Sequence, residues 1–155
     1  MNWDALGAIA ELVGALGVVA TLAYLAVQIR QNTSVVRTSN FQDLMRNYSS
    51  LSATVSENAE AAEIFRKGLA SYEALSELDK VRFQWMISEP FRGAQTCFQL
   101  QRRGLIDQEL SADYMTSFTG LLRAPGVREY WASGALWWHE GFREFIDRKL
   151  RELGA

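Results

Sequence analysis

One stretch near the start of the chain constrains the fold more than any other: ALGAIAELVGALGVVATLAYLAVQI, from Ala5 to Ile29. Its only charged side chain is that of Glu11. A helix of this length reaches roughly 37 Å, whereas the hydrocarbon core of a bilayer is about 30 Å thick. The stretch therefore predicts a helix that crosses a membrane.

A soluble core helix and a secretory signal peptide both fit this stretch less well. The helix of a soluble core usually keeps a polar stripe, but between Leu12 and Val27 the only polar side chains are Thr21 and Tyr24. A secretory signal peptide begins with basic residues and has an apolar run of about 7–15 residues. Here no Lys or Arg precedes the run, and the run is longer. We therefore interpret residues 1–31 as a transmembrane helix.

The basic residues around the stretch predict its orientation. None precedes it, whereas Arg30, Arg37 and Arg46 follow it closely. Because Lys and Arg are retained on the cytoplasmic side, the N-terminus is expected outside and residues 32–155 in the cytoplasm. The single cysteine, Cys97, agrees with a reducing compartment, since it can form no intramolecular disulfide.

Residues 32–155 are enough for one modest domain with its own core. Their charges nearly cancel, with fifteen Lys or Arg against sixteen Asp or Glu, which argues against binding to nucleic acid. Two prolines and a lack of Asn-Gly or Asp-Gly turns argue against a sheet. We predict an all-α protein, in which the transmembrane helix continues as a long helix into a small cytoplasmic helical bundle.

Helical spacing and capping residues predict the elements of this bundle. The apolar residues Leu44, Tyr48, Leu51 and Val55 are spaced by 4, 3 and 4, which indicates a helix. Three further helices are expected to start at caps, and a last one to follow a break at Pro125-Gly126. The expected caps are Ser56, Ser76 and either Asp107 or Ser111. In the helix that starts at Ser76, Pro90 is expected to cause a kink and Gly104 to end the helix. The last helix is expected from about Val127 to Leu153.

Small residues recur along one face of the predicted transmembrane helix at spacings of 3, 4, 3 and 4. This pattern lets spanning helices approach closely, and an acid beside it usually faces a partner or a cavity. One interpretation is an interface with a second copy or with a larger membrane protein. The alternative is a protonated or hydrated carboxyl near the helix end, among glycines that are common in membrane helices. The predicted interface comprises Gly7, Ala10, Glu11, Gly14, Gly17 and Thr21.

Three tryptophans near the C-terminus form the second candidate surface. Trp131 and Trp138 are seven residues apart and so share a helix face, whereas Trp137 points about 100° away from Trp138. These residues either pack in the core or contribute to a surface for an apolar ligand or a partner protein. Both interpretations remain open, with packing favoured for Trp131 and Trp138 and exposure for Trp137.

No pattern of residues indicates an enzyme. The single histidine, His139, cannot form a multi-histidine metal site, and its neighbour Glu140 points away from it. Cys97 is interpreted as a small buried apolar residue. Nucleophile-elbow, phosphate-loop and dinucleotide-loop motifs are all lacking. We expect no catalytic residue, no cofactor and no metal.

Several segments carry a resemblance to a family. They are Trp3–Glu11, Val18–Leu22, Tyr24–Thr33, Gly104–Ile106 and Pro125–Arg128 with Trp131. With these segments the chain resembles a group of short, uncharacterised bacterial proteins of proteobacterial type that span the membrane once. The resemblance implies only a single-pass protein of proteobacterial type, and it implies no activity. We expect the protein in the bacterial inner (cytoplasmic) membrane.

The sequence thus leads to three hypotheses about function. The first is a non-enzymatic, single-pass accessory or assembly protein, whose partners are the lipid bilayer and either a second copy or a larger membrane complex. The second is a small homo-oligomeric channel with a ring of Glu11 side chains near one mouth. The third is a membrane-tethered sensor that binds an apolar ligand in its tryptophan-rich bundle.

Overall fold

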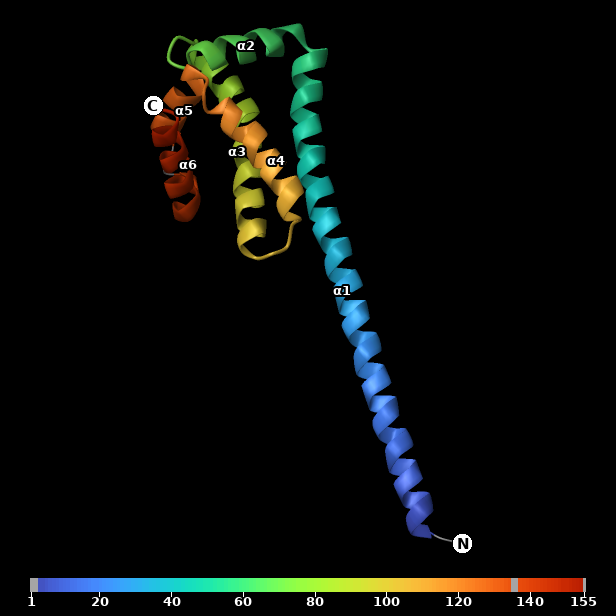
Figure 1. Ribbon diagram of the computed structural model, residues 1–155. Helices are drawn as coiled ribbons and strands as arrows, with labels where there is room; N and C mark the ends of the chain where they lie inside the picture. The colour runs from blue at the N-terminus through green and yellow to red at the C-terminus, as the bar shows by residue number, and fades with distance from the viewer. Residues whose placement is uncertain (1–2, 135–136, 155) are drawn as a thin grey trace. The chain divides into compact units, whose positions relative to one another are not determined.

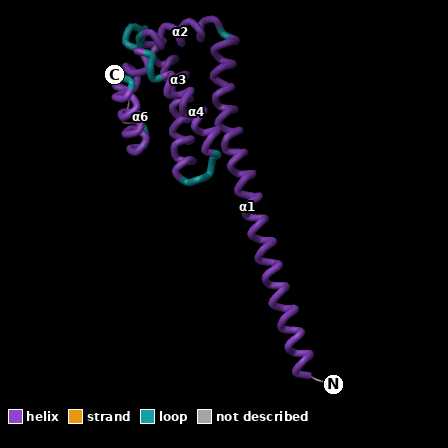
Figure 2. The backbone as a smooth tube through the Cα atoms, viewed as in Figure 1, coloured by secondary structure: helices purple, strands orange, loops and turns teal. Residues whose placement is uncertain are grey.

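The computed structural model describes residues 3–134 and 137–154, and every regular element in these ranges is a helix (Figures 1 and 2). The prediction of an all-α protein is therefore confirmed for the described residues. The first helix continues without a break across residues 31 and 32, where the membrane segment was predicted to end, as expected. The helices are α1 (Trp3–Glu57), α2 (Ala59–Ala70), α3 (Glu77–Arg102), α4 (Gln108–Leu121), α5 (Pro125–Gly134) and α6 (Glu140–Glu152).

By its internal contacts the chain divides into two compact units, residues 1–37 and 38–155. Helix α1 contributes to both, so that the first unit holds its N-terminal part and the second unit holds its C-terminal part together with α2 to α6. The predicted boundary between residues 31 and 32 concerned the membrane segment, and it stays a prediction.

Capping residues set most helix starts in the second unit. The Ser76 hydroxyl accepts a hydrogen bond from the Asp79 backbone N–H at 3.2 Å, and Asp107 Oδ1 accepts from Leu110 N at 3.1 Å. The cap at Ser76 was predicted, and Asp107 was one of the two candidates for the other cap. The end of α3 before Gly104, whose φ of 66° suits glycine, was also predicted. The predicted cap at Ser56 is wrong. Asn58 caps α2 instead, through a 3.0 Å bond from Ala61 N to Asn58 Oδ1.

The single helix expected from Val127 to Leu153 is also wrong, since the structure has two helices there. Helix α5 begins at Pro125, where a missing N–H costs nothing because the first N–H groups of a helix have no partner within it. It ends at Gly134, and α6 begins at Glu140. Residues 135 and 136 lie outside the described part of the chain.

The core of the second unit forms where α3 packs on α2 and α4, and α2 packs on α5. Figure 1 shows α3 and α4 side by side and antiparallel, joined by a short loop. Phe91 of α3 lies at the centre of an aromatic cluster, with ring centroids 5.0 Å from Phe118, 5.3 Å from Trp131 and 5.6 Å from Trp138. The fully buried side chains include Phe83, Ile87, Phe91, Leu122, Phe142 and Ile146.

Candidate functional site

The N-terminal part of α1 exposes large apolar side chains on all of its sides. Between Leu12 and Ile29 these side chains are 46–65% exposed, and none of the most apolar part of the helix is buried. Water around such a surface is unfavourable by roughly 25 cal/mol per Å². Among the described residues, α1 is the one helix long and apolar enough to cross a membrane. The exposed residues are Leu12, Val13, Leu16, Val18, Val19, Leu22, Tyr24, Leu25, Val27 and Ile29.

The predicted small-residue face lies entirely on this part of α1. A side chain added at Gly7, Gly14 or Gly17 would meet nothing within 4 Å, so the first unit itself does not use the space that these glycines leave. The Thr21 hydroxyl donates a hydrogen bond to the Gly17 carbonyl oxygen at 2.8 Å, which satisfies it within the helix. Glu11 borders the face and is exposed, and Ala10 is helical.

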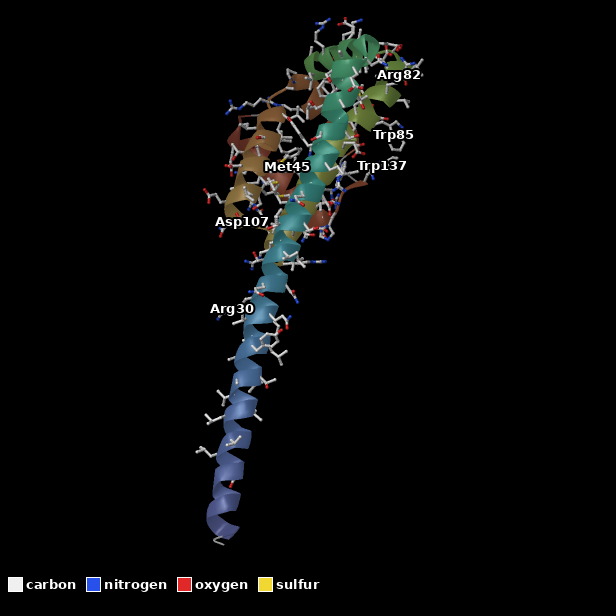
Figure 3. All side chains as sticks on the ribbon, turned by 90° about the vertical axis from the view of Figure 1, so that its right-hand side faces the viewer. Arg30, Met45, Arg82, Trp85, Asp107 and Trp137 are labelled. Carbon is white, nitrogen blue, oxygen red and sulfur yellow. The ribbon has the colours of Figure 1, made fainter. Side chains whose placement is uncertain are left out.

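The three tryptophans differ in their surroundings. Trp131 is only 4% exposed, and its ring stacks on that of Trp138 with centroids 6.5 Å apart. Trp131 Nε1 donates a hydrogen bond to Asp147 Oδ1 at 2.8 Å, which ties α5 to α6. Trp137 is 90% exposed and projects from the ribbon in Figure 3. Trp131 is therefore buried in the core, Trp138 is partly buried and packs against it, and of the three only Trp137 is exposed.

His139 and Cys97 have structural surroundings. His139 is exposed, precedes α6, and donates its backbone N–H to Gln95 Oε1 at 3.0 Å. Cys97 is fully buried, and this burial raises the pKa of its thiol to about 11. A thiol with such a pKa is a poor nucleophile at neutral pH. The described residues contain no group of His, Cys, Asp and Glu side chains that could hold a metal ion.

The second unit contains a cavity of about 740 Å³ that the sequence did not reveal. Its walls come from the C-terminal part of α1 and from α2, α3 and α4. The lining is mostly apolar, and it includes no tryptophan. The lining residues are Phe41, Met45, Tyr48, Leu51, Ser52, Val55, Ser56, Phe65, Pro90, Leu110, Asp113, Tyr114, Ser117, Phe118, Gly120 and Leu121.

Tyr114 forms part of the inner wall of this cavity. It is 8% exposed, and burial raises the pKa of its phenol to about 12, with smaller contributions from Cys97, Tyr48 and Glu89. Its hydroxyl lies against Gly93, where an added Cβ would be 2.0 Å from the oxygen. The close fit between α3 and α4 at this point thus depends on a glycine.

Helix α3 also carries an apolar face that sequence analysis did not single out. Leu78, Val81 and Trp85 are 49–66% exposed, while the opposite face, with Phe83 and Ile87, is fully buried. The spacing of 3 and 4 was visible in the sequence. It could not distinguish the two faces, because both have apolar residues at helical spacing.

These observations define an all-helical protein with one apolar N-terminal helix that could cross a membrane and a helical unit that contains a largely apolar cavity. No family of known proteins, no curated protein and no solved structure matches the chain.

Proposed function

We propose that the chain is a non-enzymatic, single-pass protein of the bacterial inner membrane, with its N-terminus outside and residues 32–155 in the cytoplasm. The observation that carries the proposal is the exposure of every large apolar side chain between Leu12 and Ile29. In water such a surface would be unfavourable, and in a bilayer it meets lipid tails. The Arg residues that follow the helix, beginning with Arg30, support the orientation.

The accessory role is association through the small-residue face of α1. Gly7, Gly14 and Gly17 have open space around them, so the backbone of a second helix could approach closely there. The partner is a second copy or a larger membrane complex. The apolar face of α3, with Leu78, Val81 and Trp85, offers a further surface for a partner protein in the cytoplasm.

Association in a membrane two-hybrid assay tests this role. Gly14→Leu and Gly17→Leu place a bulky side chain on the face and are expected to reduce association about tenfold, equivalent to 1.4 kcal/mol. Ala23→Leu is the matched control, because position 23 lies two and a half turns after position 14 and so on the opposite side of the helix. Equal association in all three variants would refute the role of this face.

A further inference from the structure

The cavity in the second unit has no part in the proposed anchoring or association. We propose that it binds one uncharged, single-chain lipid-type molecule, with an apolar chain and a neutral head that carries a hydroxyl or carbonyl group. The inference rests on the proposed function in one respect, because a domain anchored at a bilayer lies close to the lipid-type molecules that the bilayer contains.

The size and the walls of the cavity suit an apolar chain. Its volume of about 740 Å³ lies within the range of roughly 300–1,000 Å³ that is usual for ligand pockets. On α1, the buried Leu44 is followed at helical spacing by Tyr48, Leu51 and Val55. These three residues line the cavity, and the protein buries their side chains only in part. Tyr48 keeps 52% of its surface exposed, and Leu110 on α4 keeps 41%. An apolar chain in the cavity would cover these walls and remove their apolar surface from water, which is favourable.

The charge of the lining selects an uncharged head. Asp113 is the one ionisable carboxylate among the lining residues, and no Lys, Arg or His is among them. A fatty acid or a phospholipid would therefore bring a negative charge beside a carboxylate with no cation to balance it. A cationic head would gain little either, because Asp113 is exposed and exposed ion pairs contribute little.

Polar groups in the lining can form hydrogen bonds with a neutral head group. The Tyr114 side chain is largely buried, and its hydroxyl lies against Gly93 where α3 and α4 meet. Ser52 and Ser117 add hydroxyl groups that both donate and accept. A ligand hydroxyl or carbonyl would find hydrogen-bonding groups here, whereas a pure hydrocarbon would leave them unpaired.

Photolabelling of the full-length protein in phosphatidylcholine vesicles tests the proposal. The probe is a long-chain alcohol that carries a diazirine on its chain, and the matched fatty acid with the same diazirine is its charged counterpart. After irradiation, labelled peptides are identified by mass spectrometry. We expect the alcohol to label peptides from residues 41–56 and 110–121 about tenfold more than the acid does, and excess unlabelled alcohol to suppress this labelling.

Three variants locate the bound alcohol. Gly120 lines the cavity, and an added Cβ there meets nothing within 4 Å. Gly120→Phe therefore fills part of the cavity, and the Cβ of the new side chain causes no clash. Ser52→Phe fills the cavity from α1 and serves as a second test. Gly134→Phe is the control, because Gly134 also has open space around it but lies outside the lining. Circular dichroism verifies that each variant keeps its helices.

We expect both filling variants to lose the labelling of residues 41–56 and 110–121, and the control to keep it. Three results would overturn the proposal: labelling that both filling variants leave unchanged, equal labelling by the acid, or crosslinks between two copies in place of lipid adducts. Labelling of residues 5–29 in the same digest reports separately on the membrane anchor. If residues 5–29 are labelled while the cavity peptides are not, the proposed anchor stands and only the cavity ligand is refuted.

Discussion

Gly126 of α5 lies in direct contact with the backbone of Gly68 in α2. A Cβ atom placed on Gly126 would lie 1.7 Å from the Gly68 carbonyl oxygen and 2.8 Å from the Tyr72 nitrogen. Gly68 is itself confined on another side, where an added Cβ would lie 2.1 Å from the Phe83 ring. The two glycines therefore allow α2 to pack between α5 and α3 at a distance that no other residue permits.

Gly126→Ala is expected to destabilise the second unit by about 3 kcal/mol or more, because the added methyl group meets backbone atoms that cannot turn aside. Chemical unfolding in detergent, followed by tryptophan fluorescence, measures the effect. Gly120→Ala is the control, since an added Cβ there meets nothing and alanine favours a helix over glycine by up to about 1 kcal/mol. Equal stabilities of the two variants would contradict the close contact.

The helix ends were predictable where local chemistry decides them. Ser76 and Asp107 cap helices through their own side chains, and Gly104 ends one through its positive φ. The break predicted at Pro125-Gly126 lies next to the turn at residues 122–124, and both residues open α5 instead of preceding it, but the reason for the glycine was not predictable. Its neighbour Gly68 is far away in the sequence, and only the packing of α5 on α2 brings them together.

The hydrogen bond between Trp131 and Asp147 is expected to stabilise the packing of α5 on α6. Asp147→Ala removes the acceptor and leaves the buried indole N–H without a partner, which should cost about 1–3 kcal/mol. Asp147→Asn keeps an acceptor oxygen and should lose less. Thermal unfolding measures both variants, and an alanine variant as stable as the wild type would show that the bond contributes nothing.

The stability of the second unit is expected to fall as the pH rises from about 10 to 12. Burial raises the pKa of Tyr114 to about 12, whereas a tyrosine in an unfolded chain has a pKa near 10. In this window the unfolded chain loses the phenolic proton first, so ionisation favours unfolding, by about 2–3 kcal/mol at pH 12. Denaturant unfolding at several pH values measures the fall.

Tyr114→Phe keeps the ring and removes the ionisation, so its stability should fall less steeply over the same window. A smaller fall remains expected, because burial also raises the pKa of Tyr130. Identical slopes for the wild type and the variant would contradict the assigned burial of Tyr114.

Cys97 is expected to react slowly with thiol reagents in the folded protein. With its pKa raised to about 11 by burial, roughly one thiol in a thousand is ionised at pH 8. Its full burial also blocks access. A colourimetric disulfide reagent should therefore react much faster after denaturant is added, and rapid reaction in the native state would refute the burial.

The candidate sites were predictable only where they depend on residues close together in the sequence. The face with Tyr48, Leu51 and Val55 was identified as helical, but its role as a cavity wall depends on α3 and α4, which are distant in the sequence. Trp131 and Trp138 do pack together, although Trp138 lies after α5 in the segment that precedes α6, so the shared-face argument did not apply. The small-residue face of α1 was visible in the sequence because it depends only on helical spacing.

The central claim is that residues 5–29 lie in the membrane, and vesicle flotation after alkaline carbonate extraction tests it most directly. The wild-type protein should float with the lipid, and Leu16→Arg combined with Val19→Arg should weaken insertion by about 5 kcal/mol or more. Leu78→Arg, on an exposed face of the second unit, is the control and should float normally. If the wild-type protein is instead released by carbonate and stays in the aqueous fraction without detergent, the account of this protein as membrane-anchored is wrong.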